Sequence, residues 1–122
     1  MIKDKDGFVC QLDTNEVFVF GSNMNGFHYG GAAQKALDWG AIMGIGVGRQ
    51  GKTYAIPTLD TDMSKLSLTT IQYFLNEFLN YAELFPNTKF LLTKIGQGIA
   101  GFTAEEIESI MPHYIPENVI HI

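Results

Sequence analysis

Basic residues and cysteine are both scarce in this chain. Its 122 residues include 8 Lys and Arg and 13 Asp and Glu, which gives a formal net charge of -5. A general nucleic-acid binder needs a basic face that displaces counterions from phosphates, so this balance argues against such a role. Cys10 is the only cysteine. An intrachain disulfide and a CxxC metal or redox pair are therefore excluded.

Metal-binding and membrane-spanning patterns are missing as well. His28, His113 and His121 lie far apart and show no HExxH spacing, so neither a zinc site nor a resident cofactor is expected. No apolar core follows the charged first residues, as it would in a signal peptide. No run reaches the roughly 18 apolar residues of a membrane span. We therefore expect a cytoplasmic protein without membrane association, and the sequence leaves its oligomeric state open.

What is present fits one domain over residues 1–122, with a hydrophobic fraction of 46%. Short β-type runs alternate with stretches of helical periodicity. Strands are expected over residues 8–12, 17–20, 53–56, 89–93 and 118–122, and helices over 31–39, 68–85 and from 103 to 111. This alternation predicts an α/β layered fold with a mostly parallel or mixed sheet.

The first candidate site is the glycine-rich turn at residues 96–101. It follows the expected strand 89–93 and precedes Thr103-Ala104-Glu105-Glu106, which matches a capping box at a helix start. Glycines let a backbone approach a ligand, and successive N–H groups favour a phosphate. Open α/β sheets bind ligands past the carboxyl ends of their strands, which is where this turn lies. The alternative is that the glycines only shape a tight turn.

The second candidate site follows the expected strand 17–20. Gly21-Ser22-Asn23 ends this strand, and Gly30-Gly31-Ala32-Ala33 opens the next helix. Asn23 offers hydrogen bonds to a sugar, and His28 is a candidate general base or ribose contact. If strands 17–20 and 89–93 are neighbours, both turns face one crevice. Otherwise the segment is an ordinary loop in which Asn and Gly supply positive φ angles.

A third segment, residues 46–53, matches the P-loop pattern GxxxxGK[ST] letter for letter. A P-loop needs a helix after the loop, because the helix N-terminus holds the phosphate. Here Thr53-Tyr54-Ala55-Ile56-Pro57 follows, which is β-rich and contains a proline that would break a helix. The context therefore argues against a P-loop, and binding of ATP or GTP through residues 46–53 is kept as an alternative.

Residues 90–106 resemble a segment of macrodomains, in which a strand runs into an S/G-x-G-I-x-G-[FY] turn and a helix with acidic residues near its start. Residues 17–23 resemble the family's strand that ends in Asn-Ala-Ala-Asn, and residues 30–33 resemble its first glycine-rich loop. The chain is also similar to short bacterial and phage relatives that contain FGSN, YAIPT and IGxGxAG.

The resemblance implies a three-layer α/β/α, macrodomain-like fold with a crevice for ADP-ribose or a related NAD-derived nucleotide. The ligand-binding residues would be Gly21, Ser22, Asn23, Gly30, Gly31, Gly96, Gln97, Gly98, Ile99, Ala100, Gly101 and Phe102. Asn23 and His28 would be catalytic if the protein hydrolyses ADP-ribosyl linkages. Many macrodomain hydrolases carry an acidic residue after the first glycine loop, and it is missing here. Hydrolysis is therefore left open, and a non-enzymatic interaction domain is the remaining alternative.

Overall fold

The centre of the molecule is a five-stranded mixed sheet with the strand order β4-β5-β3-β6-β7. The computed structural model describes all residues from 1 to 122. Four parallel strands, β3 (Glu16–Asn23), β5 (Thr53–Leu59), β6 (Lys89–Leu92) and β7 (Val119–His121), are joined at one edge by the antiparallel β4 (Gly48–Gln50). The predicted α/β fold with a mixed sheet is confirmed.

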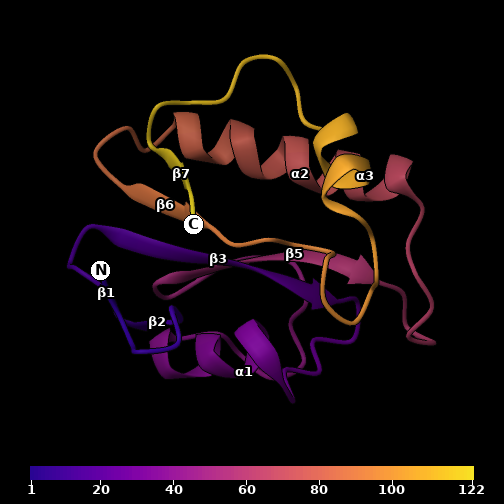
Figure 1. Cartoon of the computed structure of the whole chain (residues 1–122), viewed down its shortest axis with the longest axis horizontal. Coiled ribbons are helices and arrows are strands. Elements are labelled where there is room, and N and C mark those ends of the chain that lie inside the picture. The colour runs from indigo at the N-terminus through magenta and orange to yellow at the C-terminus, as the bar shows by residue number, and fades with distance from the viewer.

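Helices lie on both faces of this sheet (Figure 1). One face carries α1 (Gly31–Ala36), the short 3-10 helix η1 (Leu37–Trp39) and a small hairpin of β1 (Ile2–Lys3) and β2 (Val9–Gln11). The other face carries α2 (Leu68–Glu83) and α3 (Ala104–Ser109). No helix combines the length and apolar character that crossing a bilayer requires.

The central strand β3 is buried by both layers. Val17 and Val19 belong to the larger core under α2 and α3, whereas Phe18 and Phe20 belong to the smaller core under α1. Successive side chains of a strand point to opposite faces, so a continuous apolar run suits a strand that is covered on both sides. The predicted buried strand is confirmed.

Two strands extend further than the sequence pattern predicts. β3 continues through Gly21, Ser22 and Asn23, which pair with β5 instead of leaving the sheet as a loop. β5 likewise continues through Pro57, which was predicted to end it. Proline is tolerated there because β4 pairs with β5 only as far as Ala55. On the β4 side of Pro57 no strand carbonyl therefore lacks a donor because of the missing N–H.

The two helices on the second face begin at side-chain caps. Ser67 accepts the N–H of Thr70 at the start of α2, whose apolar stripe buries Ile71, Leu75, Phe78, Leu79 and Ala82. In α3, Thr103 Oγ1 accepts the N–H of Glu106 at 3.1 Å, and Glu106 Oε1 accepts the N–H of Thr103 at 2.9 Å. The predicted capping box is confirmed. The hydrogen bond from the Thr103 backbone lowers the pKa of the Glu106 carboxyl.

Candidate functional site

The structure brings the two predicted glycine elements together. β3 and β6 are parallel neighbours in the sheet. Thr93, directly after β6, donates to the Val19 carbonyl from its backbone N–H at 3.1 Å and from its hydroxyl at 2.7 Å. Just beyond, a Cβ on Gly21 would lie 3.5 Å from the Gly96 nitrogen. The end of β3 and the start of the 96–101 turn are therefore in contact.

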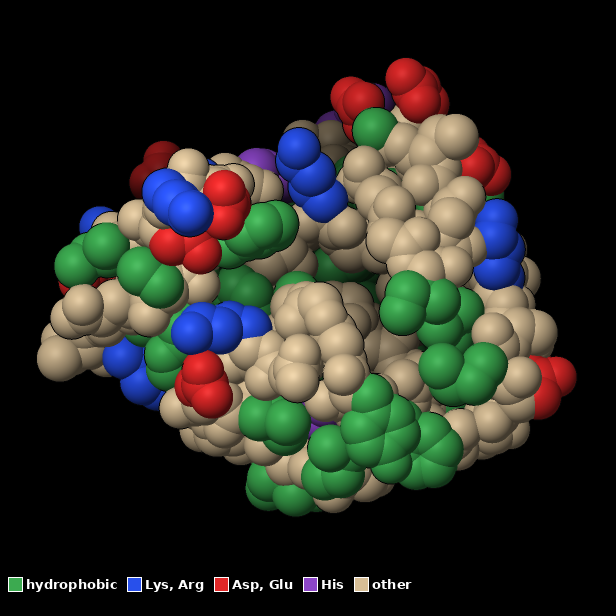
Figure 2. All heavy atoms as spheres, turned by 60° about the horizontal axis from the view of Figure 1, so that its bottom comes forward, with side chains coloured by type: hydrophobic (Ala, Val, Ile, Leu, Met, Phe, Trp, Pro, Cys, Tyr) green, Lys and Arg blue, Asp and Glu red, His purple; other side chains and the backbone are tan.

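Beyond this contact the two chain segments part. The chain leaves β3 toward α1 on one face of the sheet and leaves β6 toward α3 on the opposite face (Figure 1). In open α/β sheets, ligands bind where neighbouring parallel strands send their connections to opposite faces, because a crevice opens between the loops. Figure 2, turned to bring the α1 side forward, shows a face that is hollowed near its centre.

The 96–101 turn is closed on itself by backbone hydrogen bonds. The N–H of Phe102 donates to the Gly96 carbonyl at 2.8 Å, and the N–H of Gly101 donates to the Gly98 carbonyl at 3.0 Å. Both Gly96 and Gly101 have φ of +73°, which a side chain would strain. A Cβ on Gly96 would also lie 3.0 Å from the Ile107 side chain in α3. The turn is thus a defined structure that is packed against α3.

The same turn leaves a run of backbone donors without partners. None of the N–H groups of residues 96–100 donates to an acceptor in the protein. Gly98 and Ile99 are exposed, and no atom lies within 4 Å of the position that a Cβ of Gly98 would take. Successive N–H groups without internal acceptors form a binding site for anions, phosphates in particular.

A crevice of about 780 Å³ adjoins the turn at the carboxyl ends of β6 and β7. Gln97 of the predicted site lines it, together with polar and charged residues outside the predicted site: Thr93, Lys94, Glu108, Ser109, His113 and His121. Lys94 lies two residues after the end of β6, so its position after a buried strand was the available signal. His113 comes from the connection between α3 and β7, and His121 is the last residue of β7, so their approach to the crevice depends on how β7 pairs with β6.

Ser22 and Asn23, predicted ligand contacts, are buried and hold loop backbone. The Ser22 hydroxyl donates to the Gly46 carbonyl. Asn23 accepts the Phe27 N–H at 2.9 Å through Oδ1 and donates to the Phe27 carbonyl at 3.0 Å through Nδ2. These side chains shape the loop after β3, and their contact with a ligand stays a prediction.

His28, the candidate general base, is only 1% exposed. Its Nε2 lies 3.1 Å from the Ile42 carbonyl oxygen and 3.0 Å from that of Ile45. Carbonyl oxygens only accept, so Nε2 carries the proton in this arrangement. Nδ1 is buried without a hydrogen-bond partner. The ring packs edge-on against Phe20. The side chain therefore joins two loops and is shielded from solvent.

Gly30 and Gly31 lie at the open start of α1. Gly30 precedes the helix in an extended conformation, and no atom lies within 4 Å of a Cβ on either glycine. No side chain caps this helix start. The two glycines consequently leave the start of α1 open, but they do not line the crevice beside the 96–101 turn.

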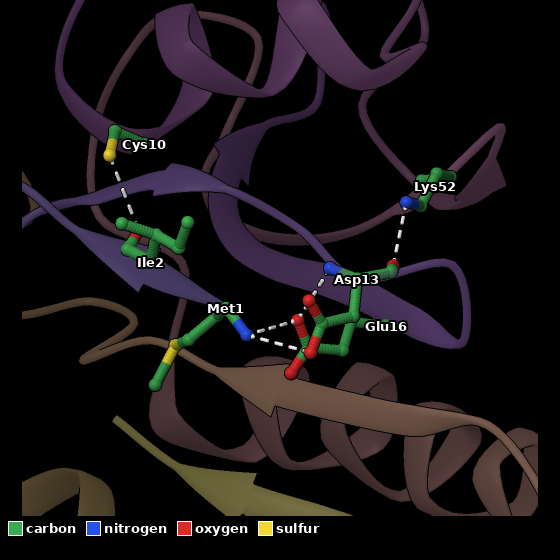
Figure 3. A network of polar contacts seen from close by, with 6 residues as sticks. All are labelled: Met1, Ile2, Cys10, Asp13, Glu16 and Lys52. Atoms are coloured by element: carbon green, nitrogen blue, oxygen red, sulfur yellow. Dashed lines mark hydrogen bonds and ion pairs between the residues drawn. The ribbon is translucent and has the colours of Figure 1, made fainter.

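The P-loop match at residues 46–53 forms a β-hairpin. β4 and β5 pair antiparallel across the turn at Gly51, and a strand stands where a P-loop requires a helix. The turn also lies at the amino end of β5, opposite the crevice. Lys52 Nζ donates to the Asp13 carbonyl at 2.7 Å, next to the ion pairs of the Met1 ammonium with Asp13 and Glu16 (Figure 3). Lys52 is thus engaged in fastening the N-terminal segment.

Exposed apolar side chains also gather near the site. The loops after β3 and before β4 present a set of them, here called the apolar patch: Met24, Phe27, Tyr29, Ile42, Met43 and Ile45. The rings of Phe27 and Tyr29 stack with centroids 5.5 Å apart. Hydrophobic side chains line the lower edge of the face in Figure 2.

The arrangement as a whole provides donors for an anion and a crevice for an attached group. No cluster of three or more His, Cys, Asp or Glu suited to a metal ion occurs in the molecule. Comparisons with protein-family models, curated proteins and solved structures found no significant match to this chain.

Proposed function

We propose that this protein binds ADP-ribose or a related NAD-derived nucleotide at the turn that follows β6 and in the crevice beside it, at the carboxyl ends of β6 and β7. The diphosphate would lie against the free N–H groups of residues 96–100. This run of donors is the observation that carries the proposal, because phosphate oxygens are strong acceptors that such N–H groups can bind without any lysine or arginine in the motif.

The adjoining crevice supports a nucleotide rather than a bare phosphate. Its volume of about 780 Å³ falls within the range of roughly 300–1,000 Å³ that is usual for small-molecule sites. Polar side chains of Thr93, Gln97 and Ser109 could bond to a sugar or a base edge, and Ile107 and Ile115 offer apolar surface. The resemblance to macrodomains over residues 90–106 names the same ligand class.

The proposal is for binding rather than hydrolysis. Asn23 and His28 are both buried, and each has a hydrogen bond to loop backbone. A general base must come within hydrogen-bond reach of the proton that it removes, or reach it through one water. Incubation with ADP-ribosylated protein, followed by measurement of released ADP-ribose, separates a binder from a hydrolase.

Calorimetric titration with ADP-ribose, AMP and ATP tests the proposal. We expect heat with ADP-ribose, and weaker binding in Gly98→Val. The backbone at Gly98 is not left-handed and has open space around it, so the variant folds while its side chain obstructs the N–H groups. Asn87→Val, exposed near the amino end of β6, is the matched control and keeps wild-type affinity. Absence of heat and of a thermal shift with millimolar ADP-ribose would overturn the proposal.

The apolar patch favours a second candidate function, a non-enzymatic interaction domain. Exposed apolar patches that include aromatic residues often mark protein–protein contacts. This candidate predicts no response to any of the three nucleotides. The same calorimetric series therefore separates the two functions.

A further inference from the structure

Lys65 lies beside the 96–101 turn, although it comes from a distant part of the chain. Its Nζ donates to the Gly101 carbonyl at 3.4 Å and lies 4.5 Å from the centre of the Phe102 ring. Neither contact neutralises the ammonium. The cation therefore stands at the end of the run of free N–H groups.

The segment that carries Lys65 is held by contacts with the loop after β3 and with β5. It follows β5, whose carboxyl end lies next to that of β3. The Asn25 side chain, from the loop after β3, donates to the Thr61 carbonyl at 2.6 Å. Lys65 itself forms a β-bridge with Leu59. The backbone of Lys65 is thus held in place by the fold, and its ammonium reaches the Gly101 carbonyl and the Phe102 ring from there.

Lys65 takes part in no ion pair. The ion pairs in the molecule involve Met1 with Asp13 and Glu16, and Lys35 with Asp38. The Glu106 carboxylate accepts the Thr103 N–H in the capping box, and the charge of Lys65 adds to this hydrogen bond in lowering the pKa of Glu106. An ammonium has three donors, and only one is used by the Gly101 carbonyl.

We infer that Lys65 is a binding residue that contacts a phosphate held on the N–H groups of residues 96–100. The inference rests on the proposed function for the location of the phosphate, and it adds a specific charge contact from outside the glycine motif. Lysine binds phosphate as a point charge, and desolvated charge-assisted hydrogen bonds are stronger than neutral ones. The chain thereby meets a charged ligand although its own net charge is -5.

The test compares Lys65→Met with Lys65→Arg and Lys89→Met in calorimetric titrations of inorganic pyrophosphate and ADP-ribose. Lys65→Met keeps an apolar stem on Phe102, so the fold is retained, and the circular dichroism spectrum checks this. We expect both ligands to bind about tenfold more weakly to Lys65→Met, and Lys65→Arg to retain most of the affinity. Lys89 is exposed at the start of β6, so Lys89→Met removes the same charge far from the crevice and should leave affinity unchanged.

Three results overturn the inference. Lys65→Met could bind pyrophosphate as tightly as the wild type does, Lys89→Met could lose as much affinity as Lys65→Met, or the wild type could bind neither ligand. If the wild type binds pyrophosphate but not ADP-ribose, the proposed function fails. The pyrophosphate titrations would still decide the role of Lys65.

Discussion

Ser22, Asn23 and His28 all direct their polar atoms at the backbone of loops near the crevice. Ser22 and His28 reach the segment before β4, and Asn23 closes the loop after β3 on Phe27. A buried polar group costs free energy unless it is hydrogen-bonded, so these contacts specify how the loops pack. The groups without a partner in the protein are instead the backbone N–H groups of residues 96–100.

Replacement of His28 tests its structural role. We expect His28→Ala to lower the free energy of unfolding by about 2–4 kcal/mol, because a buried ring is lost and two carbonyl oxygens lose their donor. Chemical denaturation followed by circular dichroism measures this. If the variant keeps wild-type stability but loses a hydrolase activity, His28 acts as a catalyst and the structural account of it is wrong.

Gly46 tests the close contact between the two loops. A Cβ there would overlap the Asn23 carbonyl oxygen, so we expect Gly46→Ala to destabilise the fold by about 3 kcal/mol or more. Gly30→Ala is the control, because Gly30 has an extended backbone and no atom within 4 Å of its Cβ position. Thermal unfolding of the two variants should differ clearly, and equal melting temperatures would contradict the contact.

At the scale of elements, α3 and the β4–β5 hairpin show how context decides what a motif does. A glycine-rich stretch precedes α3, and another forms the β4 strand and turn of the hairpin. The 96–101 turn leads from a strand into a capped helix, whereas residues 46–53 lead from one strand into another. Only the first stands at the carboxyl end of a parallel strand with donors left free. Residues 46–53 match the P-loop pattern more closely than residues 96–101 match any phosphate-binding pattern. Yet Lys52 of that segment donates to the Asp13 carbonyl of the protein itself.

The capping box gives α3 a stability that depends on pH. The folded pKa of Glu106 is lowered, so the charged carboxylate contributes stability above its unfolded pKa, and this contribution is lost as pH falls through the folded value. We expect wild type to exceed Glu106→Gln in melting temperature at about pH 6 and to approach it near pH 3. A difference between the two proteins that stays constant over this range would rule out the charged capping interaction.

Replacement of Lys52 tests whether the β4–β5 hairpin binds a nucleotide. Its ammonium fastens Asp13 at the opposite end of the sheet from the crevice, so we expect Lys52→Ala to leave the affinity for ADP-ribose and ATP unchanged. The melting temperature should fall slightly, as is usual for loss of an exposed polar contact. Loss of magnesium-dependent ATP binding in this variant would support the P-loop alternative instead.

At the scale of the whole molecule, the strand order places the crevice. β3 lies between β5 and β6, and its connection to α1 leaves on the face opposite to α2 and α3. The crevice lies beside this point, at the carboxyl ends of β6 and β7. Residues far apart in sequence, such as Gly21 and Gly96, meet where β3 and the chain after β6 lie side by side.

Local patterns predicted a large part of this arrangement. The apolar run of β3, the stripe of α2 and the capping box of α3 each depend on neighbours within a few residues, and the structure confirms them. The continuation of β5 through Pro57 was not predictable, because it depends on where β4 stops pairing.

The candidate site was predictable in part for the same reason. The glycine turn was visible in the sequence. The burial of His28 depends on packing against residues 42–45, and the approach of Lys65 depends on the course of the chain after β5. Both are long-range contacts that no local spacing encodes.

The most direct test of the central claim is a two-dimensional ¹H–¹⁵N NMR titration with ADP-ribose, in which the assigned amide signals report each N–H group. Donation of a hydrogen bond to phosphate changes the chemical shift of an amide proton. We predict that the largest saturable shifts fall on residues 96–100, whose N–H groups have no acceptor in the protein. No shift in these signals at millimolar ADP-ribose, or shifts confined to residues 46–53, would contradict the account.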